Sequence, residues 1–465
     1  MAEKLIFLTG RLARPRLERL LGGLGKTDFA WQIIDTGVKV AALMTEEIIK
    51  RRVSLPDGAT RVVLPGRFRG EPERLAEHFG VPFVRGPDEI ADLPPFLGRA
   101  GEPPDLSRHK MRIFAEIVDA SALKVNEIAE RAGVLAAAGA DVIDLGCLPD
   151  TPFPHLADAV RELKRRGLRV SVDSANVDEL KTGAKAGADY LLSLTEDTLS
   201  LARDHPATPV LIPSRPDDLS SLDRAIEMAE KEGIGFIADP VLDPIHFGFA
   251  RSLQRFIETR QRWPDAELLM GTGNLTELTD ADSSGVTAVL LGLCSELSIG
   301  NVLVVHVSPH TAKTVEEHDL ARRIMFAAGN DDALPRGYHP GLLQIHDRKP
   351  FPAALEDIEA LAKAVRDANF RIMTAPDGIH IFSSKGHFTA QDAFELFPQL
   401  GVEADGAHAF YLGAELMKAE IAWRLGKRYT QDEPLAWGVA APAPEADRTR
   451  LAKAGHTLRA RERDT

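Results

Sequence analysis

The 465-residue chain has little of several residue types, and each scarcity excludes a class of protein. Two cysteines, Cys147 and Cys294, are too few for a disulfide scaffold or a cysteine-based zinc or iron–sulfur centre, and they fit a reducing cytosol. Positive charge is also scarce, with 56 Lys and Arg residues against 69 Asp and Glu residues. The net charge of -13 argues against a protein that follows the phosphates of a nucleic acid.

Long hydrophobic runs are missing as well. The longest apolar stretch, near Gly285–Cys294, is stopped by Ser295 and Glu296, well short of the roughly 20 residues that span a bilayer. The apolar segment at the N-terminus is short and runs into Arg11 and Arg14, unlike a secretory signal. We therefore expect a folded cytoplasmic protein with no membrane partner.

Between residues 106 and 330, short apolar segments alternate with helical patterns. Strands are predicted at Ile113–Val118, Val142–Leu145, Val170–Val172, Tyr190–Leu194, Pro209–Ile212, Phe236–Ala238, Glu267–Met270 and Val302–Val305. Eight strand–helix repeats in about 220 residues match a (β/α)8 TIM barrel. An open doubly wound sheet is the alternative, but it more often has about five to seven strands. We predict an α/β fold with the barrel at its centre.

Residues 1–105 repeat the strand–helix pattern on a smaller scale and predict a Rossmann-like α/β domain that ends near Glu102–Asp105. Gly-Arg turns follow three of its predicted strands, at Thr9–Arg11, Pro65–Arg67 and Arg85–Gly86. Glycine lets a backbone approach a phosphate and arginine can bind one, whereas ordinary turn chemistry is the simpler interpretation.

Residues 331–440 predict a small α+β domain. A hairpin is expected around Ala375–Asp377, followed by a short helix over Thr389–Phe397 that its first residue caps. A longer helix is expected over Gly406–Leu425. Residues 441–465, rich in Ala and Pro and then charged, are expected to form a flexible tail.

Polar residues stand at the ends of most predicted barrel strands, where the active sites of TIM barrels lie. In chain order they are Asp119, Asp144, Asp173, Ser193, Arg215, Asp239, Asn274 and His306. A single Asp at such a place is more often a helix N-cap. Asp173, Asp239 and Asn274 all lie at the same end of the predicted barrel, and together they favour a site. An ionised Asp accepts two parallel hydrogen bonds from an amino-pyrimidinone edge, so the set suits a heterocycle with paired N–H donors.

Four segments resemble motifs of pterin-binding barrels. Gly139–Gly146 resembles the second-strand motif of dihydropteroate synthase, and Val170–Ser174 resembles its third-strand motif, whose Asp contacts the pterin. Ala238–Pro240 resembles its sixth-strand motif. Gly271–Asn274 is closer to the pterin-dependent methyltransferases, in which an Asn lies beside the reactive nitrogen of the reduced pterin. The order of these motifs over residues 110–330 supports a resemblance to the pterin-binding TIM-barrel superfamily.

The three-domain order resembles the dihydropteroate synthase-like proteins of tetrahydromethanopterin biosynthesis. Three features of the true synthases are missing. Glu116–Ser121 replaces their Asn-Val-Thr-Pro-Asp-Ser-Phe loop, the Lys after strand seven is absent, and Val304 stands where an Arg precedes the strand-eight histidine. Those groups normally hold the pyrophosphate and the aminobenzoate. The resemblance thus implies a retained pterin half and an altered leaving-group half.

The resemblance implies a transferase that makes a tetrahydromethanopterin- or folate-type cofactor of one-carbon metabolism. It would condense a dihydropterin-6-methyl pyrophosphate with an arylamine carrying a ribosyl phosphate, and pyrophosphate would leave. Two alternatives stay open. One is a methyl-pterin-dependent methyltransferase or carrier that works with a corrinoid partner, and the other is a non-catalytic pterin-binding protein.

The resemblance also assigns roles to the residues at the strand ends. The expected pterin-binding residues are Asp173, Ser193, Asp239 and Asn274. Asp119 and His306 are the expected catalytic residues, and Arg215 with His306 would bind phosphate. The reduced pterin is a substrate. The resemblance is compatible with Mg²⁺ on the pyrophosphate, but the sequence identifies no set of ligands for it. The expected partners are the pterin and the arylamine, and a homodimer is allowed.

Overall fold

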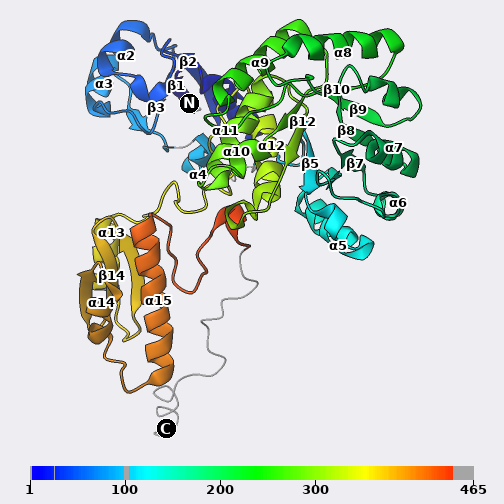
Figure 1. Cartoon of the computed structure of the whole chain (residues 1–465). Helices are drawn as coiled ribbons and strands as arrows, with labels where there is room; N and C mark the ends of the chain where they lie inside the picture. Colours follow the sequence, from blue (N-terminus) through cyan, green and yellow to red (C-terminus); the bar gives the residue numbers. More distant parts are fainter. Residues whose placement is uncertain (1–2, 26, 89, 99–103, 443–465) are drawn as a thin grey trace. The chain divides into compact units, whose positions relative to one another are not determined.

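The structure is a computed structural model that describes residues 3–25, 27–88, 90–98 and 104–442 (Figure 1). It divides into two compact units between His339 and Pro340. The first unit contains two parallel sheets and the second contains one antiparallel sheet. Among the described residues, no helix combines the length and the apolar character needed to cross a membrane.

The larger sheet has eight parallel strands and nearly closes into a barrel (Figure 1). Its strands are β5 (Arg112–Ile117), β6 (Val142–Gly146), β7 (Val170–Asp173), β8 (Tyr190–Leu194), β9 (Thr208–Leu211), β10 (Ile237–Ala238), β11 (Leu269–Gly271) and β12 (Asn301–Val304). They follow the order β10-β9-β8-β7-β6-β5-β12-β11, and a parallel bridge between Ala238 and Leu268 joins the two edges. The predicted TIM-type barrel is confirmed.

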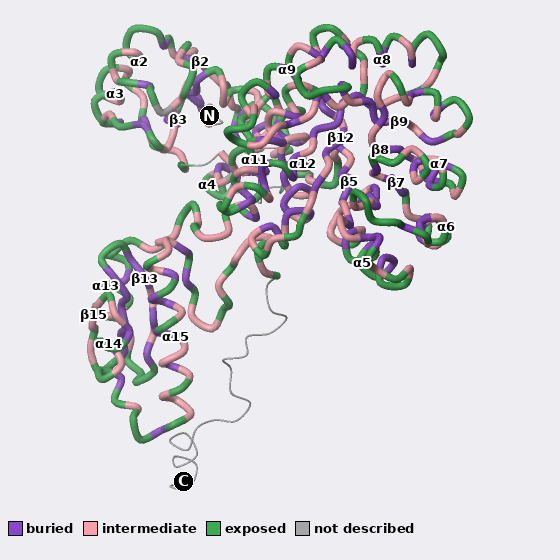
Figure 2. The backbone as a smooth tube through the Cα atoms, in the orientation of Figure 1, coloured by how far each residue is buried: buried purple, intermediate pink, exposed green. Residues whose placement is uncertain are grey.

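Helices follow most barrel strands and cover the sheet, so the strands are buried on both faces (Figure 2). They are α5 (Val125–Ala138), α6 (Leu156–Arg165), α7 (Val177–Ala186), α8 (Leu219–Glu232), α9 (Phe249–Arg262), α10 (Gly273–Thr276), α11 (Ser283–Glu296) and α12 (Thr314–Asn330). After β8 the connection is a 3-10 turn at Leu199–Arg203. Inside the barrel, Phe114 packs edge-on against Tyr190 with ring centroids 4.9 Å apart. These rings belong to an apolar cluster that fills the amino-terminal half of the barrel.

The smaller sheet of the first unit is a doubly wound α/β layer. Its strands are β1 (Glu3–Thr9), β2 (Phe29–Asp35), β3 (Arg61–Leu64) and β4 (Phe83–Arg85), in the parallel order β2-β1-β3-β4. Its helices are α1 (Arg14–Gly23), α2 (Glu46–Arg52), α3 (Pro72–Phe79) and α4 (Leu93–Phe96). Alternate β1 residues enter two apolar clusters, Leu5 with α1 and Ile6 with α2 and α3. The Rossmann-like α/β fold predicted for this segment is confirmed.

The second unit is the predicted α+β fold, with one error in its elements. Strands β13 (Arg371–Ala375), β14 (Gly378–Ser383) and β15 (Gly386–Ala390) form an antiparallel sheet with α13 (Leu355–Ala364), α14 (Ala393–Leu400) and α15 (Gly406–Leu425). The start of the helix predicted over Thr389–Phe397 is wrong, because Thr389 belongs to strand β15 and pairs with His380 of β14. The helix begins after Asp392, whose side chain accepts a hydrogen bond from the Phe394 N–H at 2.7 Å. Most of the predicted tail, from residue 443 on, lies outside the described residues.

Candidate functional site

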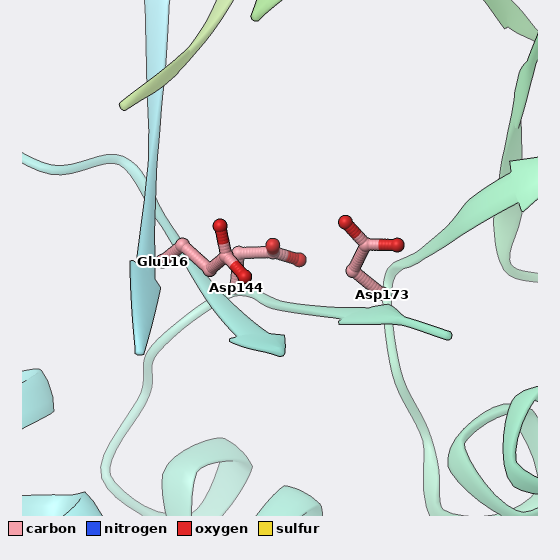
Figure 3. Close-up of side chains that lie close together, drawn as sticks. All are labelled: Glu116, Asp144 and Asp173. Carbon is pink, nitrogen blue, oxygen red and sulfur yellow. The ribbon is translucent and has the colours of Figure 1, made fainter. Parts of the chain in front are cut away.

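Three carboxyl side chains from adjacent strands lie together inside the barrel (Figure 3). Glu116 of β5, Asp144 of β6 and Asp173 of β7 each place an oxygen within 4.8 Å of the others. Glu116 and Asp144 are register partners, and Asp173 lies opposite Gly146. Side chains two residues apart share a strand face, so Glu116 and Asp144 point inward like the core residues Phe114 and Val142.

Asp144 lies deepest in this carboxyl cluster. One of its oxygens accepts a hydrogen bond from the Ser171 hydroxyl, and the other, Oδ2, has no hydrogen-bond partner among the described residues. Burial, followed by the nearby charges of Asp173 and Glu116, raises the pKa of Asp144 well above its usual value. Burial therefore favours the protonated form of Asp144, whose hydroxyl can donate to a ligand.

Glu116 and Asp173 titrate near neutrality. Burial raises the pKa of Glu116 to about 7, and the neighbouring charge of Asp173 adds to the effect. Burial likewise raises the pKa of Asp173 to about 6. Because the groups are so close, their protons leave as a coupled set. A ligand with N–H donors or a cation favours the ionised forms.

Asp239 adds a fourth carboxyl group at the end of β10. Its Oδ1 accepts a hydrogen bond from the Val241 N–H at 2.8 Å. Burial raises the pKa of Asp239 to about 7, although that hydrogen bond and the charge of Arg255 oppose the shift. The charge of Asp173 raises it further, which places the two predicted pterin ligands within electrostatic reach of each other.

Arg255 of α9 holds the loop after Asp239, and sequence reasoning missed it. The buried guanidinium donates to the carbonyls of Pro240 at 2.9 Å and Val241 at 2.6 Å. It also pairs with the Asp243 carboxylate at 2.8 Å. An arginine on a predicted amphipathic helix gives no signal by itself, because most such residues face solvent.

The predicted residues at the other strand ends separate into two groups. Asp119 and His306 line a cavity of about 390 Å³ together with Glu116, and Asp119 pairs with Arg131 at 2.8 Å. Both expected catalytic residues thus line a cavity that Glu116, but neither Asp144 nor Asp173, also lines. Arg215, by contrast, is exposed on the loop after β9.

Ser193 and Asn274 do not stand at simple strand ends. Ser193 is half-buried where the pairing of β8 with β9 shifts register. Asn274 lies on the short helix α10, and its Nδ2 donates to the Leu242 carbonyl at 2.6 Å. The Asn274 amide therefore ties the segment after β11 to the loop that follows Asp239.

The carboxyl cluster fits a divalent cation in its donor set. Mg²⁺ prefers oxygen ligands, and Glu116, Asp144 and Asp173 supply three carboxylates whose ligand atoms lie within 4.8 Å of one another. The unpartnered Oδ2 of Asp144 is one of the available atoms. A cation would have to displace the protons of these groups, so its affinity would rise with pH.

Sequence comparison assigns no activity to the chain. Residues 3–88 match the model of DUF6513, a family of unknown function. The uncharacterized protein MJ0107 of Methanocaldococcus jannaschii is 24% identical over 525 residues, which span 92% of this chain and 98% of that protein.

Similar solved structures are dihydropteroate synthases. The Yersinia pestis enzyme with a pterine-sulfa conjugate is 19% identical, with a TM-score of 0.37 over 49% of this chain and 95% of its own. The Thermus thermophilus enzyme is 21% identical, with a TM-score of 0.36 over 48% and 95%. The Anaplasma phagocytophilum enzyme with bound 6-hydroxymethylpterin-monophosphate is 17% identical, with a TM-score of 0.37 over 47% and 98%. At these values the matches say nothing of the site, whose chemistry follows from its own residues.

Proposed function

We propose that the barrel binds a reduced pterin at the carboxyl ends of its strands and that the chain is an enzyme of the dihydropteroate synthase type. The observation that carries the proposal is the set of buried carboxyl groups, Glu116, Asp144, Asp173 and Asp239, above a floor of packed apolar side chains. Such a site discriminates strongly, because a ligand that leaves these groups unpaired loses about 1–3 kcal/mol for each.

The protonation states suit the mixed donors and acceptors of a pterin edge. Ionised Asp173 and Asp239 accept the adjacent N–H groups of the amino-pyrimidinone ring, as the sequence motifs predict. Burial favours the neutral form of Asp144, and in that form its unpartnered Oδ2 can donate to a ring nitrogen or carbonyl oxygen. Asn274, fixed to the Leu242 carbonyl, completes the wall beside Asp239.

The cavity beside the cluster is the place for the second substrate. In the proposed reaction the arylamine nitrogen attacks the pterin methylene, the bond from that carbon to the pyrophosphate oxygen breaks, and the amine loses a proton. Glu116 reaches the cavity and has a pKa of about 7, so it can accept that proton at neutral pH. Arg131 and His306 on the same walls are the candidates for an amine-borne phosphate, with Arg215 as a further one from the sequence.

Mg²⁺ on the pyrophosphate would supply positive charge to the leaving group, but the carboxyl cluster would not hold it there, because its groups are assigned to the pterin edge and to the amine proton. The protein's own residues provide the remaining factors, which are orientation of the two substrates and exclusion of water by the packed floor. Asn274 favours the alternative, a methyl-pterin transferase with a corrinoid partner, because its amide is bonded to the loop that follows Asp239.

A coupled assay for pyrophosphate tests the proposed reaction. The protein is incubated with dihydropterin-6-methyl pyrophosphate and with p-aminobenzoate or a ribosyl-phosphate arylamine, each alone and together. We expect pyrophosphate only when both substrates are present, with faster release for the phosphorylated amine. Transfer of methyl groups from a methylated pterin to cobalamin, without pyrophosphate release, would instead support the methyltransferase. Tight pterin binding with neither activity would support a binding protein.

A further inference from the structure

The N-terminal sheet has a cavity of its own, of about 300 Å³, at the carboxyl ends of β1 and β3. The strand order β2-β1-β3-β4 explains its position. Helix α1 packs on one face of the sheet, and α2 and α3 pack on the other, so the connections from β1 and β3 leave in opposite directions. Open α/β sheets bind ligands in the crevice that such a reversal creates.

The lining of this cavity defines the kind of ligand it suits. Most of the wall is apolar, with Leu12, Leu17 and Val63 among the contributors. Among the described residues, the charged ones that line it are three arginines, Arg16, Arg67 and Arg336, and one acid, Asp88. Arginine side chains suit an anionic group, and the apolar wall suits an apolar body.

Two glycines of the lining lie where backbone segments approach each other closely. A Cβ on Gly66 would lie 2.5 Å from the Asp88 nitrogen, and one on Gly86 would lie 3.1 Å from the Leu64 carbonyl oxygen. The Gly86 N–H donates to that same carbonyl at 2.8 Å. The turns after β3 and β4 therefore pack backbone against backbone. This packing is sufficient reason for Gly66 and Gly86, so the two glycines are no evidence for a phosphate site.

Arg16, another residue of the lining, is held in place by the segment that follows α12. Its guanidinium donates to the carbonyls of Arg336 and Gly337, the latter at 3.1 Å. It also stacks over the Tyr338 ring, 4.5 Å from the centroid. Arginine has five N–H donors, so these contacts orient the group and leave donors for a ligand.

We propose that this cavity is a second small-molecule site, which binds a metabolite with a largely apolar body and one phosphate or carboxylate group. The anion lies at Arg16, and the apolar body lies against the side chains that α1 and β3 contribute. The site uses none of the barrel residues to which pterin binding is assigned, so each function can fail without the other.

Phenyl phosphate and benzoate are the probes, with phenol as the uncharged comparison, titrated calorimetrically into the full-length protein. Arg16→Gln removes the charge, and Ala41→Phe fills the cavity from the segment before α2. The matched controls are Arg14→Gln, on the same helix in an ion pair with Glu18, and Ala30→Phe on an exposed position of β2. Thermal melting confirms that each variant is folded, and Ala41→Phe with its control carries the test if Arg16→Gln is not.

We expect at least one anionic probe to bind. Arg16→Gln should weaken that probe about tenfold to a hundredfold, and Ala41→Phe should abolish its binding, while both controls keep wild-type affinity. Preference for phenyl phosphate or for benzoate identifies the anionic group. Phenol binding as tightly as the anions, no binding of either anion, or wild-type affinity in Arg16→Gln and Ala41→Phe would overturn the proposal. Pterin affinity should stay unchanged in all variants, which separates this outcome from a failure of the barrel site.

Discussion

At the residue scale, the carboxyl cluster places acids where water is scarce. Four carboxyl groups, those of Glu116, Asp144, Asp173 and Asp239, have raised pKa values because burial disfavours their charged forms. A cluster of this kind lowers stability when it ionises, and proteins keep it where a ligand compensates the charge. The arrangement is therefore a sign of function.

The raised pKa values predict how stability depends on pH. The folded pKa is about 7 for Glu116 and about 6 for Asp173, above the ordinary values of 4.5 and 3.8. The folded chain thus holds protons that the unfolded chain has released, so these groups lower stability as pH rises from about 4 to about 7. The double variant Glu116→Gln/Asp173→Asn removes this dependence and should be more stable than wild type at pH 8 by about 2–4 kcal/mol.

Urea unfolding at pH 5 and pH 8, with a chelator present, measures the difference. The advantage of the double variant should shrink towards pH 5, where the wild-type groups are protonated in the folded state. Parallel stability curves for the two proteins across this range would contradict the assigned protonation states.

At the element scale, the alternation of strands and helices made the barrel predictable, while the cluster itself was harder to find. Asp173 and Asp239 could be named because they end strands whose carboxyl ends meet. From the sequence, Glu116 was recognised only as part of an altered loop. Whether its side chain points into the barrel depends on the register of the strand, because a shift of one residue turns every side chain to the other face. Thr389 was misplaced for a related reason, since tertiary pairing with β14 overrides the local helix signal.

The loop between β10 and α9 gives a prediction at this scale. Arg255→Ala removes the donor to Pro240 and Val241 and leaves the mostly buried Asp243 carboxylate without its partner. We expect a loss of about 3–5 kcal/mol in the free energy of unfolding, together with weaker pterin binding because Asp239 loses its support.

The control for this change is Arg251→Ala on the same helix. Arg251 is exposed and pairs with Asp217 at 3.3 Å, so its loss should cost less than about 0.5 kcal/mol. Chemical denaturation and calorimetry with a dihydropterin compare the two variants. Equal effects of the two substitutions would show that Arg255 has no special role in holding the loop.

At the scale of the whole molecule, all the site residues precede the boundary between the two compact units. Glu116, Asp144, Asp173 and Asp239 belong to the unit that ends at His339. We therefore expect a fragment ending at His339 to fold and to bind a reduced pterin with nearly full-length affinity. Circular dichroism and calorimetry on the fragment test this. A folded fragment that has lost pterin binding would assign part of the site to the second unit.

The central claim is that a reduced pterin binds through carboxyl groups that must ionise. Calorimetric titration of 6-hydroxymethyl-7,8-dihydropterin at pH 6.5, in two buffers with different ionisation enthalpies and no added Mg²⁺, measures the protons exchanged on binding. Because Asp173 and Asp239 have pKa values of about 6 and about 7, we predict net proton release, with less release and weaker binding in Asp239→Asn. Binding without proton release, or unchanged affinity in Asp239→Asn, would contradict the account.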